Sequence, residues 1–245
     1  MKALLLAALL LPPPAALAGQ AAVKFKTSDG CSIAAFYLAP SSGAYVFINA
    51  HGLGSSKGEW GAFQTELAKA GQGYLSLDLR GHADSASCGG KPADYRKFDK
   101  AAWAAASRDI EAAAAWLAKK GIGPGRQVFC GASVGANLSL KAAAEGRLKP
   151  AALVLLSPGM DYAGIEAGKY LPAFKGPLLL AASPDDPYAW ASARELARRA
   201  AAAGQDVSFA NGGGGHGVQM LAHPGLAAAI ISKALERNAA QKKKD

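Results

Sequence analysis

The feature that most constrains the fold is an alternation between short apolar runs and longer stretches with helical periodicity. The apolar runs cover residues 45–50, 74–79, 127–131, 152–157, 177–182 and 206–210, and the helical stretches cover residues 60–70, 101–120, 134–145, 189–203 and 224–238. A run that is apolar at every position is typical of a strand buried on both faces, as in a parallel sheet covered by helices. The alternation therefore predicts a three-layer α/β sandwich.

The N-terminal part of the chain departs from this alternation. Residues 22–26 alternate in polarity and precede a second strand-like stretch, residues 31–38, with Ser28, Asp29 and Gly30 between them. A turn of this composition between two strands predicts an antiparallel hairpin. The predicted fold is thus a mostly parallel sheet of about eight strands with an antiparallel N-terminal hairpin, in one domain that spans residues 19–240.

Residues 1–18 have the layout of a secretory signal peptide. Lys2 is followed by an apolar run, and the small residues Ala16 and Ala18 precede Gly19. The prolines at positions 12–14 would break a membrane-spanning helix, and the apolar run is shorter than the roughly 20 residues that a bilayer requires. We therefore expect cleavage after Ala18, export to the periplasm or the extracellular space, and no stable membrane insertion.

Composition and charge exclude several function classes. Because 51% of the residues are hydrophobic and 18% are charged, the chain has a globular rather than a disordered composition. The formal net charge is +9, and part of it lies in a basic tail, residues 241–245. No patch of basic residues is interleaved with aromatic residues, so we expect no nucleic-acid partner. The four histidines are scattered, so we expect no metal site and no cofactor.

A serine stands in one of the loops expected at the functional edge of the sheet. In parallel sheets, the loops after the carboxyl ends of the strands form the usual ligand-binding edge. One such loop contains Gly131, Ser133 and Gly135 between a predicted strand and a predicted helix. A serine on this tight turn exposes its hydroxyl beside a helix N-terminus, which favours developing negative charge. The pattern also fits an ordinary turn in which Ser133 caps the helix.

A second loop at this edge, residues 49–56, contains glycines that allow backbone N–H groups to face a cavity. An oxyanion hole uses one such N–H together with that of the residue after the nucleophile, and here these would belong to Leu53 and Val134. His51 is either a base or a structural residue that supports the loop, and we favour the structural role.

Five segments together resemble the α/β-hydrolase superfamily in their order and approximate spacing. They read HGLGSSKGEW, YLSLDLRGHADS, GASVGANLSL, LLLAASPDDP and GGGGHG. The set is most similar to small serine esterases related to the dienelactone hydrolases and monoglyceride lipases. The resemblance implies the α/β-hydrolase fold over nearly the whole mature chain. Many relatives carry a lid domain at the position of residues 158–176, and that span is too short here, so we expect an esterase without a lid.

The resemblance implies a catalytic triad in the order serine, acid, histidine. Ser133 would be the nucleophile and His216 the base, and the acid would be an aspartate of the SPDDP segment. Counting from Ser183 at the end of the strand assigns the acid to Asp186, with Asp185 as the alternative. Among the glycines around His216, we expect those directly beside it to place its side chain and residues 212–214 to be adjustable.

The resemblance also assigns structural roles. Arg80 and His82 correspond to a segment that braces loops near the site. The second strand would run antiparallel to the sheet and start at the catalytic edge, which places Cys31 beside the loop that contains Cys88. We therefore expect a disulfide between Cys31 and Cys88, with Cys130 as a buried thiol.

These observations predict a serine hydrolase that cleaves carboxylic esters with small or medium acyl groups through an acyl-enzyme on Ser133. The partner would be a small-molecule ester substrate, and no cofactor would be needed. Two alternatives remain open from the sequence. One is a non-catalytic binding protein of the same fold, and the other is the same triad acting on amide or peptide bonds.

Overall fold

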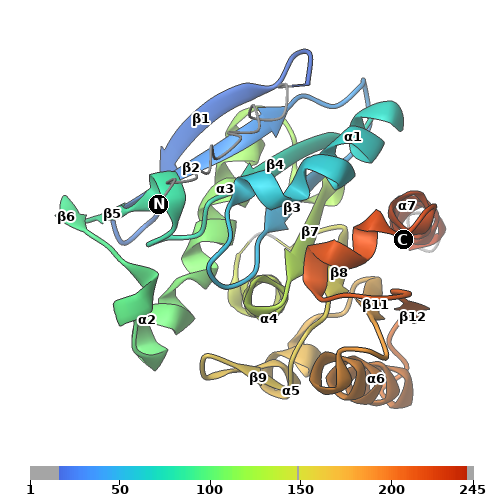
Figure 1. The fold of residues 1–245 in the computed structure, drawn as a ribbon. Helices are drawn as coiled ribbons and strands as arrows, with labels where there is room; N and C mark the ends of the chain where they lie inside the picture. Colours follow the sequence, from blue (N-terminus) through green and yellow to red (C-terminus); the bar gives the residue numbers. More distant parts are fainter. Residues whose placement is uncertain (1–16, 148, 242–245) are drawn as a thin grey trace, which may run out of the picture.

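The computed structural model describes residues 17–147 and 149–241. Of the predicted signal peptide, residues 1–16 lie outside the described residues, as do residues 242–245 of the predicted basic tail. The core is a ten-stranded sheet in the order β12-β11-β8-β7-β3-β4-β2-β5-β6, with β1 paired to β2 (Figure 1). Its strands are β1 (Ala21–Lys26), β2 (Cys31–Leu38), β3 (Val46–Ala50), β4 (Gly73–Leu77), β5 (Ser87–Cys88), β6 (Lys91–Pro92), β7 (Gln127–Ala132), β8 (Ala152–Leu156), β11 (Leu178–Ala182) and β12 (Val207–Asn211).

The direction of the strands confirms the predicted α/β-hydrolase architecture. The six strands from β12 to β4 pair in parallel, whereas β1, β2, β5 and β6 pair antiparallel at one side of the sheet. All eight predicted strands are present, and the two further strands, β5 and β6, are two residues long each. Strands of that length have too few residues to show a polarity pattern, so they could not be predicted from the sequence.

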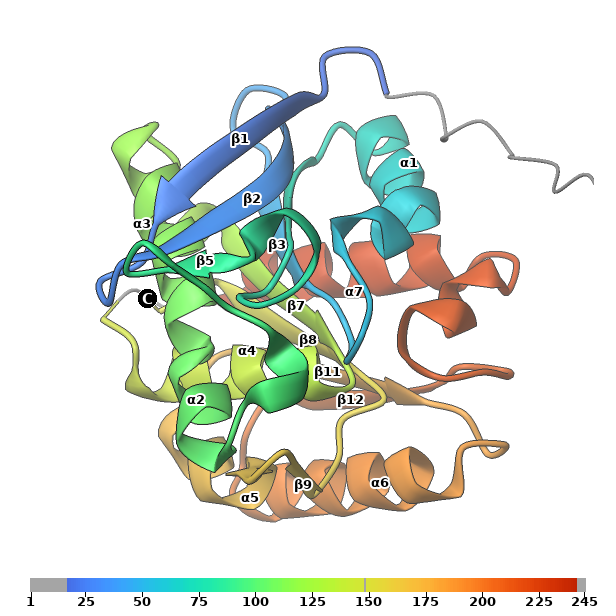
Figure 2. The ribbon, with the colours of Figure 1, turned by 60° about the vertical axis from the view of Figure 1, so that its left-hand side comes forward.

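Helices cover both faces of the sheet (Figure 2). The helices are α1 (Gly61–Lys69), α2 (Lys100–Ala105), α3 (Ser107–Lys119), α4 (Val134–Glu145), α5 (Ala167–Tyr170), α6 (Pro187–Ala202) and α7 (Leu226–Gln241). One hydrophobic core joins α3, α4 and α6 to the sheet, and a separate core joins α1 and α7 to it. Two cores separated by a sheet confirm the three-layer sandwich. Among the described residues, no helix is long and apolar enough to cross a membrane.

The prediction of one continuous helix over residues 101–120 was wrong. The chain forms α2 and α3 instead, and they meet at Ala106. There the Ala106 N–H bonds to the carbonyl of Trp103, and the Asp109 N–H bonds to the carbonyl of Ala106. These three-residue spacings tighten the backbone and interrupt the α-helix. Alanine has the highest helix propensity, so an alanine-rich sequence shows no local signal for such a break.

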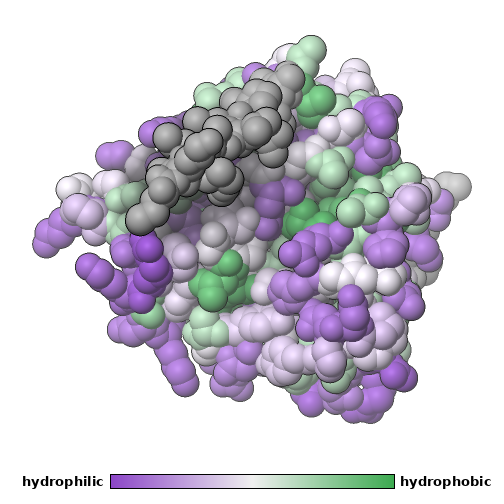
Figure 3. Space-filling model, viewed as in Figure 1, coloured by the Kyte–Doolittle hydropathy of each residue, from purple (hydrophilic) through white to green (hydrophobic). Residues whose placement is uncertain are grey.

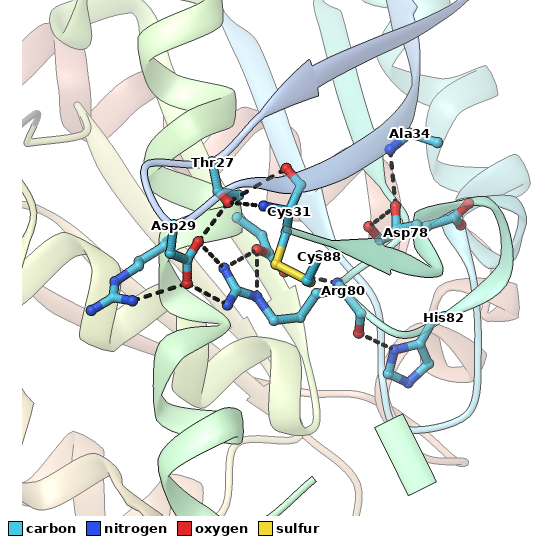
Figure 4. Close-up of a disulfide and its surroundings, with 11 residues drawn as sticks. Thr27, Asp29, Cys31, Ala34, Asp78, Arg80, His82 and Cys88 are labelled. Atoms are coloured by element: carbon cyan, nitrogen blue, oxygen red, sulfur yellow. Dashed lines mark hydrogen bonds and ion pairs between the residues drawn. A yellow bond between two sulfur atoms is a disulfide. The ribbon is translucent and has the colours of Figure 1, made fainter. Parts of the chain in front are cut away.

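A disulfide connects the antiparallel strands β2 and β5 (Figure 4). Cys31 and Cys88 are bonded, as predicted, and Cys130 is a buried free thiol. Beside the disulfide, the Arg80 guanidinium forms ion pairs with Asp29 and with the fully buried Asp109. The disulfide and this ion-pair cluster fasten the loop after β4 to the N-terminal hairpin.

Reduction of the disulfide is expected to lower the free energy of unfolding by about 4 kcal/mol, because the bond closes a long loop in the unfolded chain. The two cysteines are 57 residues apart in sequence. Urea unfolding of the wild type with and without reductant measures the change. The double variant C31A/C88A is the control and should show no further loss when reductant is added. An equal response to reductant in both proteins would contradict the prediction.

Candidate active site

Ser133 lies on a sharp turn between β7 and α4. Its backbone adopts φ 56° and ψ −124°, a conformation that residues other than glycine rarely adopt. Both flanking glycines are sterically required. A Cβ on Gly131 would lie 2.2 Å from the carbonyl oxygen of Gly135, and a Cβ on Gly135 would lie 2.3 Å from that of Ala50. The Gly-x-Ser-x-Gly pattern is therefore explained by the close approach of β7, α4 and β3, and an ordinary capped turn would not need it.

His216 and Asp186 form a close pair. The His216 Nδ1 atom lies 2.5 Å from Asp186 Oδ2, and the His216 side chain is 42% exposed. Asp186 also caps α6 by accepting a hydrogen bond from the Ala189 N–H. The neighbouring Asp185 has a different partner, since its carboxylate accepts the Gly215 N–H at 2.9 Å. Of the two aspartates proposed for the acid, the structure brings only Asp186 to the imidazole.

The glycine segment before His216 is closely packed. A Cβ on Gly212 would lie 2.0 Å from the sulfur of Met220, and Gly213 and Gly215 have φ of 78° and 85°. Glycine adopts this left-handed region without steric penalty. Space and backbone conformation thus explain glycine at positions 212 and 213, where the sequence predicted adjustable positions.

Hydrogen bonds hold the same segment on both sides of His216. The His216 N–H donates to Gln219 Oε1 at 3.1 Å. The Gly217 N–H donates to Ser157 Oγ at 2.8 Å, and this bond is buried. Because these bonds join the loop to β8 and to the turn after His216, the imidazole is presented by an anchored backbone.

Ser133 and His216 line the same cavity, whose volume is about 590 Å³. Its other lining residues are Gly52, Leu53, Gly54, Ser55, Glu59, Ala132, Gly217, Val218 and Gln219. The lining residues come from the loop after β3, the turn at the start of α4 and the segment before α7. The carboxyl ends of neighbouring strands therefore form the site, as predicted for a parallel sheet.

The two residues predicted to form an oxyanion hole, Leu53 and Val134, belong to two segments at this cavity. Val134 is the first residue of α4, so its N–H has no acceptor within the helix. Leu53 lines the cavity, and its side chain is 63% exposed. In residues 17–147 and 149–241, neither N–H has a protein acceptor. Neither N–H is thus committed to another protein group among these residues.

Two other histidines support the loop after β3. His51 is fully buried, its Nε2 accepts the Leu79 N–H at 2.9 Å, and its Nδ1 lies 2.7 Å from the Gly52 carbonyl oxygen. His82 Nε2 accepts the Gly54 N–H at 3.3 Å, and its ring stacks on Tyr95. His51 has the structural role that the sequence favoured, because neither of its nitrogens faces the cavity.

The burial of His51 predicts a dependence of stability on pH. Burial lowers the pKa of His51 from 6.5 to about 3 in the folded protein. Below pH 6.5 the unfolded chain therefore binds a proton that the folded protein does not bind. The free energy of unfolding is expected to fall by about 1.4 kcal/mol for each pH unit from pH 6.5 down to about pH 3, because this single proton favours the unfolded state.

Urea unfolding at several pH values measures this slope, and the His51→Gln variant is the comparison. Other titrating groups contribute equally to both proteins, so the variant should lose less stability per pH unit than the wild type. Equal slopes would contradict the assignment of a neutral, buried His51.

The structure also brings two residues to the site that the sequence did not assign to it. Glu59 lines the cavity and accepts the Gly52 N–H at 3.1 Å, and burial raises the pKa of its carboxyl group. Tyr162 stands with its ring edge-on to the His216 ring, with 6.5 Å between the centroids. Glu59 could have been suspected from its place in the HGLGSSKGEW segment, whereas Tyr162 lies in no motif.

No metal centre was found in the described part of the chain, where no group of three or more histidine, cysteine, aspartate or glutamate side chains could hold a metal ion. In the cavity, Ser133 offers a hydroxyl, His216 an imidazole paired with a carboxylate, and Glu59 a carboxyl group. A serine hydroxyl needs a neighbouring base to act as a nucleophile, and an imidazole paired with a carboxylate is such a base.

Several solved structures resemble this one. An esterase from Pyrococcus furiosus has a TM-score of 0.69 and 20% identity, over 89% of this chain and 90% of that chain. Est1E from Butyrivibrio proteoclasticus, solved with ferulic acid bound, has a TM-score of 0.70 and 16% identity, over 89% and 99%. A dienelactone hydrolase from Anabaena variabilis has a TM-score of 0.61 and 20% identity, over 89% and 97%. At these identities, the likeness establishes the fold.

The family follows from the sequence match. No curated protein sequence matches the chain. Residues 41–176, more than half of the chain, match the family model described as "Serine aminopeptidase, S33". The matched range contains Leu53, Ser133 and Val134, and it ends before Asp186 and His216. The protein is therefore a hydrolase of the α/β-hydrolase fold and belongs to this serine aminopeptidase family.

Proposed function

We propose that the protein is a serine hydrolase that cleaves carboxylic esters of small molecules through an acyl-enzyme on Ser133. One observation carries the proposal. The His216 imidazole is paired with Asp186 at 2.5 Å and lines the same cavity as Ser133, which stands at the N-terminus of α4. A binding protein of this fold would have no need for the three groups in this arrangement.

In the acylation step, His216 Nε2 accepts the proton of the Ser133 hydroxyl while Ser133 Oγ attacks the ester carbonyl carbon. Asp186 accepts a hydrogen bond from His216 Nδ1, which holds Nε2 free and stabilises the charged imidazole. The N–H groups of Leu53 and Val134 donate to the oxygen that becomes negative. His216 then donates its proton to the departing alcohol oxygen, and the acyl group stays on Ser133.

In the deacylation step, water takes the place of the alcohol. His216 accepts a proton from this water, whose oxygen attacks the acyl carbon, and the same N–H groups stabilise the second tetrahedral intermediate. The carboxylic acid leaves when His216 returns the proton to Ser133 Oγ. The cycle consumes one water and restores every group, so it requires no cofactor.

The cavity favours small or medium acyl groups. Its volume of about 590 Å³ is at the scale of small-ligand pockets. Residues 158–176 form only the β9–β10 hairpin (Asp161–Tyr162 and Ile165–Glu166), α5 and a short 3₁₀ turn, so this span forms no lid domain. The face of the molecule in Figure 3 is mostly hydrophilic, with small hydrophobic areas. A cavity that this span leaves open, in a protein with a mostly hydrophilic face, fits an ester that is soluble in water.

Ester substrates are also favoured by the nature of the structural neighbours, since one is an esterase and another binds ferulic acid. The second candidate is cleavage of amide or peptide bonds by the same residues, which the family description "serine aminopeptidase" favours. The two reactions share the acyl-enzyme and differ in the leaving group.

A fluorophosphonate probe and a substrate panel test the proposal. The probe should label the folded wild type, and p-nitrophenyl esters of short acyl chains should be hydrolysed faster than aminoacyl p-nitroanilides. Faster hydrolysis of the anilides would favour the peptidase candidate. Absence of both labelling and hydrolysis in a folded protein would favour the non-catalytic alternative.

We also propose that the protein is exported. The layout of residues 1–18 supports this, and so does the Cys31–Cys88 disulfide, because such bonds persist in oxidising compartments. Mass spectrometry of protein recovered from the periplasm or the medium tests the proposal. A protein that keeps residue 1 and remains in the cytoplasm would contradict it.

A further inference from the structure

Gly52, in the loop after β3, lies close to the proposed nucleophile. A Cβ on Gly52 would lie 3.4 Å from the Cβ of Ser133, so there is room for little more than a hydrogen between the loop backbone and the serine. Leu53, whose N–H is predicted to donate to the oxyanion, is the next residue in the chain. The placement of the Gly52 backbone therefore sets where the Leu53 N–H stands relative to Ser133.

The carbonyl group of Gly52 is held from inside the protein by His51. The His51 ring is neutral, since burial lowers its pKa to about 3, and its Nε2 accepts the Leu79 N–H, so the ring proton is on Nδ1. That proton is donated to the Gly52 carbonyl oxygen, which lies 2.7 Å from Nδ1. In a trans peptide, a carbonyl and the N–H that follows it point in opposite directions. The Leu53 N–H therefore points away from the buried His51 ring.

The N–H of Gly52 is held by Glu59, a wall residue of the catalytic cavity. It donates to Glu59 Oε1 at 3.1 Å. Burial raises the pKa of the Glu59 carboxyl group, so water solvates this carboxylate less than one at the surface. Withdrawal of a carboxylate from water is costly unless hydrogen bonds offset the loss, and the Gly52 N–H supplies such a bond. The pairing joins the wall of the cavity to the loop that lies against Ser133.

The other N–H groups of the loop show the same kind of restraint, with one exception. The Gly54 N–H donates to His82 Nε2 at 3.3 Å, and the Ser55 N–H donates to the Gly52 carbonyl at 3.3 Å. Across positions 52–55, only the Leu53 N–H has no protein acceptor in the part of the chain that the structure describes. The loop is thus bonded on both sides of the one N–H that the proposed mechanism uses.

Glu59 stands on a turn that is anchored independently of the cavity. In this 3₁₀ turn, Lys57–Trp60, the Lys57 N–H donates to Asp78 Oδ1 at 2.7 Å, and the Lys57 ammonium pairs with Asp78 Oδ2 at 2.6 Å. Trp60, at the end of the turn, is fully buried. A side chain on such a turn can support the loop, because its own backbone is fixed by other parts of the protein.

We propose that Glu59 is a positioning residue for the oxyanion hole, whose carboxylate holds the Gly52 N–H and so keeps the Leu53 N–H directed at the oxygen that becomes negative. The inference rests on the proposed function. With His51 on its carbonyl and Glu59 on its N–H, Gly52 is restrained from both sides before substrate binds. Such preorganised donors stabilise the transition state because they need no reorganisation during the reaction. Glu59 itself makes and breaks no covalent bond.

Two variants separate the hydrogen bond of Glu59 from its charge. Glu59→Ala and Glu59→Gln both remove the charge, and only glutamine keeps an oxygen that can accept the Gly52 N–H. In Glu59→Ala, kcat for a p-nitrophenyl ester should fall by about 10–100-fold, because a displaced donor loses transition-state stabilisation. KM should change by less than about threefold, because the oxyanion forms only after the substrate has bound. Glu59→Gln should regain most of the lost kcat.

A trifluoromethyl ketone provides a second readout. Ser133 Oγ adds to its carbonyl carbon, the hydroxyl proton moves to His216, and the carbonyl oxygen becomes an oxyanion in the hole. Its inhibition constant should be about tenfold higher for Glu59→Ala than for Glu59→Gln. Since both variants carry the same charge, this difference reports the hydrogen bond alone.

Glu66 provides the matched control. It is an acidic residue of α1 that pairs with Lys69 and does not line the cavity. Glu66→Ala and Glu66→Gln should have equal kcat values, close to that of the wild type. Thermal unfolding of all four variants would show whether each is folded.

Equal losses of kcat in Glu59→Ala and Glu59→Gln would overturn the inference and leave the proposed function standing, because the charge rather than the hydrogen bond would then matter. A loss confined to KM would overturn it as well, and so would a Glu59→Ala variant that does not fold, since Glu59 would then act through stability. A folded wild type that hydrolyses no ester would overturn both the proposed function and the inference.

Discussion

Replacement of Ser133 by alanine is expected to lower kcat for ester hydrolysis by about 10⁶-fold, to the level left by binding and the oxyanion hole alone. The variant lacks the oxygen on which the proposed mechanism forms the acyl-enzyme, and no other group of the cavity takes its place in that mechanism. Alanine should also be tolerated in the turn, because the side chain of Ser133 makes no capping hydrogen bond to α4. The loss should therefore appear with little change in stability.

Initial rates with a p-nitrophenyl ester and labelling by a fluorophosphonate measure the effect. Ser139→Ala is a matched control, since Ser139 lies on the same helix and its buried hydroxyl has no hydrogen-bond partner in the described structure. This control should keep near wild-type activity. Labelling that persists in Ser133→Ala would refute the nucleophile assignment.

Asp186→Asn is expected to lower kcat by about 10⁴-fold, because an amide can no longer hold His216 in the tautomer that leaves Nε2 free to accept a proton. The substitution keeps the size of the side chain. Asparagine also caps helices as well as aspartate does, so the start of α6 at Pro187 should be preserved. The expected loss is thus in catalysis and not in folding.

Asp185→Asn provides the comparison at the adjacent position. Among the described residues, its carboxylate accepts only the Gly215 N–H, and an asparagine oxygen can accept the same bond. We expect less than about a tenfold loss of kcat, since one neutral hydrogen bond contributes about 1 kcal/mol. Steady-state rates of the two variants decide between the aspartates, and a larger loss in Asp185→Asn would reverse the assignment.

Much of the fold follows from local sequence patterns. The five inner parallel strands, β3, β4, β7, β8 and β11, are buried at every residue because both of their faces are covered, so their mostly apolar sequences identify them, whereas the edge strand β12 is only partly buried. Gly131 and Gly135 mark a turn in which strand and helix approach too closely for any other residue. The order of the five motifs along the chain led to the correct superfamily, as the family match shows.

The break at Ala106 could not be read from the sequence. Ala106 lies within an alanine-rich stretch, so its propensity favours a continuous helix. Trp103, Ala106 and Ile110 have the spacing of a single helix face and are all buried in the same core, so the buried face continues across the break. A local pattern carries no information about the surface against which a helix packs.

The sequence by itself determined which segments of the chain form strands, the sharp turn at Ser133 and the set of candidate site residues. These features depend on neighbours within a few positions. The tertiary structure decided that Asp186 rather than Asp185 meets His216, and that the Tyr162 ring lies beside the His216 ring. Adjacent aspartates have the same chemistry, and only the direction of each side chain separates them. That direction depends on segments about 30 residues or more away in sequence, which a folded sheet brings together at one edge.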